Sequence, residues 1–128
     1  MVKTAQGGWP PGPTLAAMPL DPDALRDEDL RRWRAQFTDA SPIAELRPRH
    51  PGVCVGVVHK IRLVPGKSLE ATIEDGSGRV TATWSGRNSL PGMELGGGLR
   101  LSGTVAEDGD GARRMLNPSW SLVVEPYA

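Results

Sequence analysis

The spacing of hydrophobic positions changes once along this chain, near residue 52. Before that point, the stretch DPDALRDEDLRRWRAQF carries apolar residues three to five positions apart, as in a helix that packs on one side. Asp21 suits the N-cap, Pro22 suits the first helical position, and acidic residues precede basic ones, as the helix dipole favours. The pattern predicts a helix over residues 22–37. Its apolar side would consist of Leu25, Leu30, Trp33 and Phe37.

Beyond residue 52, hydrophobic residues alternate with polar ones, which is typical of strands that bury one face. The alternation and the turns between the runs predict five strands, over residues 53–64, 69–74, 79–84, 99–107 and about 113–124. In the first strand, one face would carry Val53, Val55, Val57, Ile61 and Leu63. The opposite face would carry Gly56, Val58, Lys60 and Arg62.

Glycine and proline interrupt these strands in a way that fits a small closed barrel. The sequence DGSG at residues 75–78 supplies the Asp and Gly that a tight hairpin needs for positive φ angles. Gly56 and Gly103 fall inside strands, where they favour bends, and Pro118 cannot donate to a ladder. Closing so few strands requires such bends. We therefore predict an all-β fold, a five-stranded Greek-key barrel preceded by one N-terminal α-helix.

The chain has 128 residues, which leaves room for one compact domain and additional segments. Residues 1–20 contain GGWPPGP and no alternation, so we expect a disordered tail. Residues 21–51 would form the helix and a Pro-rich connector, and residues 52–126 the barrel. The helix has two interpretations: it packs on its own barrel, or it docks to another protein through its apolar side.

The charge balance and the single cysteine limit which ligands and which cellular compartment fit this chain. Fifteen Lys and Arg residues balance fifteen Asp and Glu residues, so no overall field draws the chain to nucleic acid or to an anionic membrane. A nucleic-acid site would have to be a local patch. We find no membrane span and no secretion-type N-terminus, and the lone Cys54 has no internal disulfide partner, which fits a cytoplasmic protein. We expect Cys54 to be a buried, inert thiol.

Several segments, taken in order, resemble one family. EATIEDGSGRVTATWSG, PGMELGGGLRLSGTV and RRMLNPSW resemble OB-fold nucleic-acid-binding domains, in particular the tRNA anticodon-binding type and the wedge domain of branched-DNA helicases. The arrangement is also similar to small stand-alone OB-fold proteins of GC-rich bacteria, over about residues 22–124. The resemblance implies that the predicted barrel is an OB fold. The helicase wedge has HP where this chain has Asn117 and Pro118.

The resemblance also implies where a ligand would lie. OB-fold domains bind ligands across the second and third strands, between flanking loops. On this chain, that surface would contain Lys60, Arg62, Lys67, Arg79, Thr81, Thr83, Arg113 and Arg114. At the rim of the barrel, it would be joined by Arg87 and Asn88. An ordinary solvated barrel face is the alternative interpretation of the same residues.

Aromatic residues are missing from the outward positions of the central strands, which carry Thr72, Thr81 and Thr83. Because stacking contributes about 1–3 kcal/mol per base in single-strand sites, their absence predicts weak affinity. Trp84 shares the phase of the apolar positions of its strand, so we expect it to be buried. We expect Trp120 to cover the open end of the barrel.

Patterns of catalysis and metal binding are not found. His50 and His59 have no Cys, His or carboxylate partners at ligand spacing, and EDGDG at 107–111 is too short for a calcium loop. No nucleophile has a recognisable base nearby, and no Gly-rich phosphate loop is present. We therefore expect no enzyme, no metal and no cofactor.

Together, these observations support a non-catalytic module that binds single-stranded or branched DNA with weak, salt-sensitive affinity, through Arg contacts to phosphate. The alternative is a protein–protein interaction module that docks through the barrel face and the 22–37 helix, because OB folds serve both uses. RNA binding is a third hypothesis that stays open. No residue pattern here recognises a 2′-hydroxyl, the group by which a protein distinguishes RNA from DNA.

Overall fold

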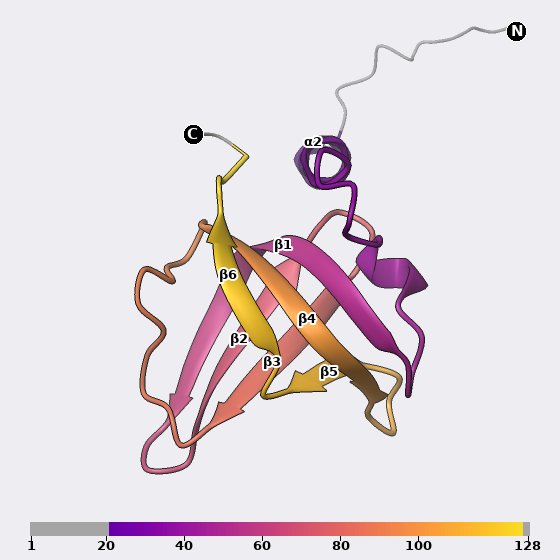
Figure 1. Ribbon diagram of the computed structural model, residues 1–128. Coiled ribbons are helices and arrows are strands. Elements are labelled where there is room, and N and C mark those ends of the chain that lie inside the picture. The colour runs from indigo at the N-terminus through magenta and orange to yellow at the C-terminus, as the bar shows by residue number, and fades with distance from the viewer. Residues whose placement is uncertain (1–20, 127–128) are drawn as a thin grey trace, which may run out of the picture.

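The computed structural model of the protein describes residues 21–126 (Figure 1). The tail predicted over residues 1–20 lies outside the described residues. An α-helix and a short 3-10 helix precede the strands. The elements are α2 (Pro22–Arg34), η1 (Ile43–Glu45), β1 (Pro51–Val64), β2 (Ser68–Glu74), β3 (Arg79–Ser85), β4 (Gly98–Glu107), β5 (Arg113–Leu116) and β6 (Ser119–Val123).

Within the described range, the six strands form one sheet in the order β1-β2-β3-β5-β4-β6, and pairing of β1 with β4 closes it into a barrel. Neighbouring strands run antiparallel, except that β3 and β5 are parallel. This confirms the predicted all-β barrel preceded by an α-helix. The predicted fifth strand is divided into β5 and β6 at Asn117, whose φ is 49°, and Pro118, which has no N–H for the ladder.

Two hydrophobic clusters lie on opposite sides of β1. Cys54 and Val58 belong to the main cluster inside the barrel, together with Leu99 and Leu101 of β4. The smaller cluster lies between β1 and helix α2 and contains Leu30, Trp33, Ala40, Val55 and Val57. The first half of β1 is therefore buried on both faces.

A β-bulge at His59 reverses the faces of β1. The register with β2 shifts between Val58 and Lys60, after which Ile61 lies opposite the buried Ala71. The prediction that Val53, Val55, Val57, Ile61 and Leu63 share one face is therefore wrong. The prediction that Gly56 and Val58 share the other face with Lys60 and Arg62 is wrong for the same reason. One extra residue in a strand moves every later side chain to the other face, and regular alternation in the sequence does not reveal it.

Helix α2 packs on its own barrel. Leu30 is fully buried and Trp33 is 6% exposed, and the indole Nε1 of Trp33 donates to the carbonyl oxygen of Val124 at 3.0 Å. The helix ends at Arg34, three residues earlier than predicted. Its apolar side is thus largely occupied within the domain, whereas Leu25 near the N-terminus is exposed.

The turn between β2 and β3 joins the barrel to α2 and η1. Gly76 has φ 85°, as the tight hairpin predicts, and a Cβ there would overlap the carbonyl oxygen of Asp27 in α2. The guanidinium of Arg31 donates to the carbonyl oxygen of Gly76 at 2.8 Å, and the backbone N–H of Ala44 donates to Ser77 Oγ at 3.1 Å. The helix therefore has a fixed position over one end of the β2–β3 hairpin.

The predicted burial of two side chains is confirmed. Trp84 is 3% exposed, and its Nε1 donates to the carbonyl oxygen of Pro118 at 3.0 Å. Cys54 is fully buried. Trp120 is half-buried and packs against the main cluster. Across residues 21–126, none of the helices combines the length and the apolar character that spanning a membrane would require.

Candidate nucleic-acid interface

A polar row crosses four strands on the outer face of the barrel. Lys60 of β1 lies opposite Thr72, Thr72 opposite Thr81, and Thr81 opposite Arg114 of β5. The bulge at His59 turns Lys60 outward, because the residues before it have the opposite phase. These side chains line a shallow groove of about 200 Å³. We call it the β1–β5 groove, and its lining consists of Lys60, Arg62, Glu70, Thr72, Thr81 and Arg114.

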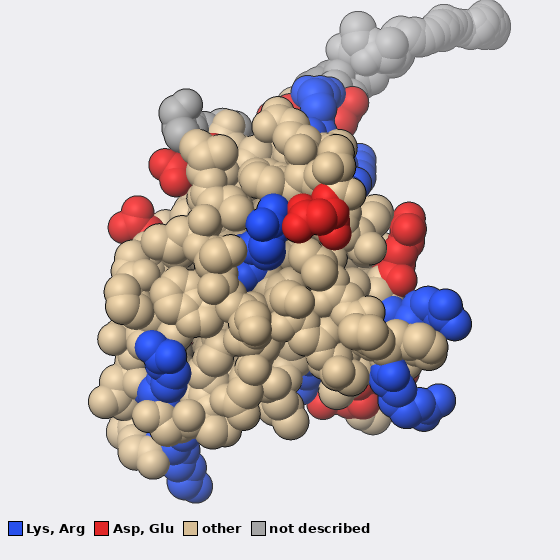
Figure 2. Space-filling view, viewed as in Figure 1, with Lys and Arg blue, Asp and Glu red and all other residues tan. Residues whose placement is uncertain are grey.

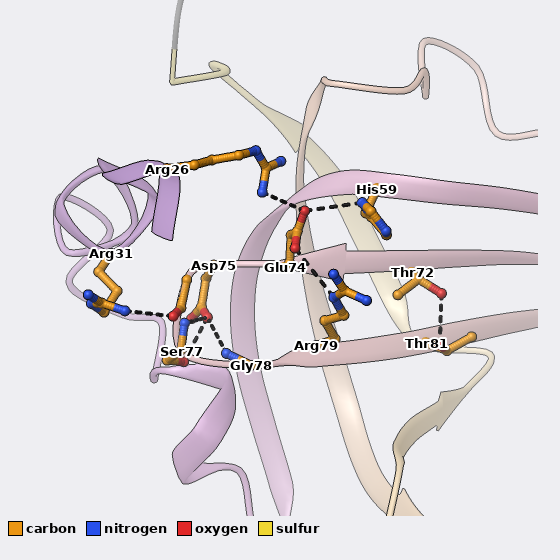
Figure 3. Close-up of polar contacts among 11 residues, drawn as sticks. Arg26, Arg31, His59, Thr72, Glu74, Asp75, Ser77, Gly78, Arg79 and Thr81 are labelled. Carbon is orange, nitrogen blue, oxygen red and sulfur yellow. Dashed lines mark hydrogen bonds and ion pairs between the residues drawn. The ribbon is translucent and has the colours of Figure 1, made fainter. Parts of the chain in front are cut away.

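Hydroxyl groups form the floor of this groove. Thr72 Oγ1 and Thr81 Oγ1 are 2.8 Å apart and share a hydrogen bond (Figure 3). Thr83 Oγ1 accepts a hydrogen bond from the guanidinium of Arg114 at 3.3 Å. The floor can therefore donate and accept hydrogen bonds but provides no aromatic surface for stacking.

Glu70 lies between the cations of the groove. Its carboxylate oxygens are 3.7 Å from Arg62 NH1 and 4.0 Å from Arg114 NH1. The guanidinium of Arg114 also donates to Asp108 of the β4–β5 hairpin at 2.8 Å, and this hydrogen bond is the main reason why the pKa of Arg114 is raised. Arg114 is thus permanently charged and held in place, whereas Lys60 forms no ion pair with any of residues 21–126.

A second set of charges borders the groove beneath helix α2 (Figure 3). Glu74 of β2 is 5% exposed and pairs with three groups from three elements. Its carboxylate is 2.8 Å from Arg26 of α2, 3.2 Å from Nδ1 of His59, and 3.3 Å from Arg79 of β3. These residues line a cleft of about 440 Å³ together with Asp23 and Asp27. Arg79, a predicted site residue, is therefore held at the end of the groove nearest the helix.

Three of the predicted residues lie at the opposite end of the groove. The backbone N–H of Gly86 donates to the carbonyl oxygen of Lys67 at 2.7 Å, so the β1–β2 turn lies beside the loop that carries Arg87 and Asn88. All three side chains are exposed. The barrel therefore brings together Lys60, Arg62, Thr81, Thr83 and Arg114, with Arg79 at one end and Lys67, Arg87 and Asn88 at the other.

Arg113 does not join this group. It precedes Arg114 in β5 and so points to the opposite face, where its guanidinium donates to the carbonyl oxygens of Ala44 at 2.9 Å and Leu46 at 3.5 Å. It anchors the connector that follows η1. The sequence could have revealed this difference between Arg113 and Arg114, because adjacent residues of a strand point to opposite faces.

Leu116, which the sequence prediction did not include, lies opposite Thr83 and is 66% exposed. Its outward position could have been predicted from its alternation with Met115, which is buried. Arg26 and His59 were missed as well, because their proximity to Glu74 depends on the docking of α2 and on the bulge. Figure 2 shows the face over β4 and β6, on which most of the surface carries neither basic nor acidic side chains.

Comparisons with known proteins identify the fold but not a family. No family model matches the sequence, and no curated protein matches it. A domain of replication protein A from Methanococcus maripaludis matches with a TM-score of 0.56 and 16% identity, over 68% of this chain and 98% of that one. Such a likeness, together with the topology described above, establishes an OB fold, as the sequence predicted.

Two further solved structures share this architecture. The OBody AM3L09, bound to hen egg-white lysozyme, has a TM-score of 0.54 and 16% identity, over 68% of this chain and 96% of that one. The Ifi202 HINa domain, in complex with 20bp dsDNA, has a TM-score of 0.52 and 20% identity, over 71% of this chain and 49% of that one. One of these relatives in fold is bound to a protein and the other to DNA.

Proposed function

We propose that this OB-fold domain is a non-catalytic module that binds single-stranded or branched DNA in the β1–β5 groove, with weak and salt-sensitive affinity. The observation that carries the proposal is the row of Lys60, Thr72, Thr81 and Arg114 across four strands. Cations stand on both sides of a hydroxyl floor, an arrangement that suits phosphates at the edges and bases in the middle. The DNA complex of the structurally similar Ifi202 HINa domain supports this use of the fold.

The chemistry of the groove explains why the affinity would be weak. Stacking of bases on aromatic rings contributes about 1–3 kcal/mol per base, whereas Leu116, beside Thr83, offers an exposed apolar side chain without a ring. Glu70 occupies the position between Arg62 and Arg114 where a phosphate would be most strongly attracted. Binding therefore depends on contacts that phosphate makes in competition with Glu70, and salt weakens such contacts.

Docking of a protein partner is the second candidate function. The OBody bound to lysozyme shows that a protein of this architecture can hold a protein, and exposed Leu116 would favour such a contact. Helix α2 is a poor docking element, because Leu30 and Trp33 are already buried against β1. The barrel face is therefore the surface that a protein would use.

The test is fluorescence anisotropy of labelled single-stranded, duplex and forked DNA and of a matched RNA, at two salt concentrations. The double variant Lys60→Thr and Arg62→Thr removes two exposed cations and keeps β-forming residues. If each cation contacts one phosphate, the slope of log affinity against log salt falls by about 1.4 for a single strand, at about 0.7 per contact. Glu70→Gln should strengthen binding, because it frees Arg62 and Arg114 from their carboxylate.

Arg32→Gln is the control for loss of positive charge, since the ion pairs of Arg32 with described residues are those with Glu28 and Asp29 of its own helix α2. It should leave binding unchanged. No binding of any nucleic acid at low salt would refute the proposal and direct the search to protein partners. If the protein prefers the matched RNA, the ligand would be RNA and not DNA, and the β1–β5 groove would remain the proposed binding site.

A further inference from the structure

The connector before β1 contains a backbone feature that favours glycine but carries an arginine. Arg49 has φ 66°, a conformation in which the Cβ of an ordinary residue is crowded. Its backbone N–H donates to the carbonyl oxygen of Val105 at 2.7 Å, and the N–H of Val105 donates to the carbonyl oxygen of His50 at 3.0 Å. Residues 49 and 50 together oppose Val105, which is the pattern of a β-bulge whose first position usually holds glycine.

Within the part of the chain that the structure describes, no polar contact of the Arg49 side chain explains its presence. Arg49 and the nearby Arg47 are exposed, and neither forms an ion pair or a side-chain hydrogen bond with any of residues 21–126. In contrast, Arg113 is tied to the same connector through the carbonyl oxygens of Ala44 and Leu46. A strained backbone that presents a free cation points to a role outside the folding of the domain.

This cation pair lies next to the β1–β5 groove. Ala106 of β4 is opposite Arg114 of the groove, and the adjacent Val105 is bonded on its other side to the bulge at residues 49 and 50. The backbones of Arg49 and Arg114 are therefore two strand spacings apart, about 10 Å when measured across the strands. Figure 1 shows the start of β1 beside the β4–β5 hairpin at the lower right, and Lys and Arg side chains project from that edge in Figure 2.

None of the described acidic residues near this edge forms an ion pair with Arg47 or Arg49. Asp108 is bound to Arg114, and the Oδ1 of Asp110 accepts from the backbone N–H of Ala112 in its own turn. Glu45 and Glu107 are exposed but form no ion pair with Arg47 or Arg49. As far as residues 21–126 are concerned, both guanidinium groups keep their full set of donors for an external oxyanion.

We propose that Arg47 and Arg49 form a second phosphate-binding site, which receives a single nucleic-acid strand after it leaves the β1–β5 groove at Arg114 and passes the β4–β5 hairpin. This inference rests on the proposed function. Each arginine can bind a phosphate through two parallel hydrogen bonds, a contact that depends on the backbone of the strand and not on its sequence. A strand too short to pass the hairpin would not reach this site.

The test is Arg49→Gly, because glycine relieves the backbone conformation while removing the cation. The melting temperature should stay the same or rise, and the affinity for an oligonucleotide of about 15 residues should fall about two- to fivefold, as expected for one exposed ionic contact. The affinity for an oligonucleotide of about five residues should not change. Arg47→Ala should produce the same length-dependent loss.

Two reference variants separate this inference from the proposed function. Lys60→Thr with Arg62→Thr should weaken binding of both oligonucleotides, whereas Arg32→Gln should weaken neither. If the groove variant loses affinity but Arg49→Gly does not, the second site is refuted while the groove remains. A marked drop in the melting temperature of Arg49→Gly would show that Arg49 is structural, and an absence of binding by the unaltered protein would overturn both proposals.

Discussion

Burial inside the barrel changes the acidity and the reactivity of the Cys54 thiol. The thiol is fully buried, and its pKa is raised from 9.0 to about 12, first by desolvation and then by the nearby carboxylate of Asp75. The thiolate is the nucleophilic form of cysteine, so the folded protein keeps this thiol neutral and unreactive at physiological pH.

The raised pKa predicts a loss of stability in alkali. Between pH 9 and about 12, the unfolded chain loses the thiol proton while the folded chain retains it, so the free energy of unfolding falls as the pH rises. Urea unfolding at several pH values from 8 upward would measure this slope. Cys54→Ala is the reference variant, because it lacks the titrating group.

The alanine variant should be less stable near neutral pH but should decline less steeply in alkali, so the difference between the two proteins should shrink as the pH rises. Equal slopes for the two proteins would contradict the raised pKa of Cys54. Labelling with a thiol reagent offers an independent check, since the folded protein should react only when it unfolds.

At the scale of elements, the β2–β3 turn holds the N-terminal segment on the barrel. Asp75 is fully buried, and its carboxylate accepts hydrogen bonds from the backbone N–H groups of Ile43 at 2.9 Å and Gly78 at 3.2 Å. It also accepts from the N–H of Ser77 at 2.9 Å and from Ser77 Oγ at 2.7 Å. One side chain thus ends the hairpin and fixes η1.

Asp75→Ala should lower the free energy of unfolding by about 2–4 kcal/mol, because it leaves one buried and three partly buried donors without an acceptor. Urea denaturation would measure the loss. Asp110→Ala is the matched control, since Asp110 is exposed and accepts from a neighbour in its own turn, so its loss should cost less than about 1 kcal/mol. Equal effects of the two substitutions would contradict the conclusion that Asp75 connects the β2–β3 turn to η1.

At the scale of the whole molecule, closure of the barrel depends on β1, which pairs with β2 through its second half and with β4 through its first. Gly56 comes directly before Val57, the residue that takes part in both pairings. A Cβ at this position would be 2.8 Å from the carbonyl oxygen and 3.0 Å from the nitrogen of Glu74. Only a residue without a side chain allows β1 to pass so close to the end of β2.

Gly56→Ala should therefore destabilise the whole domain, by about 1–3 kcal/mol or more, because backbone atoms cannot move aside as a flexible side chain could. Thermal unfolding followed by circular dichroism would measure the change. Gly109→Ala in the β4–β5 turn is the control, since a Cβ there meets no other atom within 4 Å and its φ is not positive. A neutral result for Gly56→Ala would show that closure tolerates displacement of β1.

Much of the candidate site follows from alternation in the sequence. Thr81 and Thr83 alternate with buried Val80, Ala82 and Trp84, so their outward position was predictable. Lys60 and Arg62 were assigned to the outer face correctly, although the bulge at His59 lay undetected between them and the first half of β1. Arg113 was misplaced relative to Arg114, which strand alternation alone could have prevented.

The sequence by itself determined the strands of the barrel, the helix before them and the burial of Cys54 and Trp84, because these depend on local periodicity and on turn residues. Tertiary structure alone decided the register shift in β1, the gathering of Arg26, His59 and Arg79 around Glu74, and the position of Arg49 beside Val105. These features arise from contacts between segments far apart in the chain. Their energies depend on distances that no local pattern contains, so only the closed barrel reveals them.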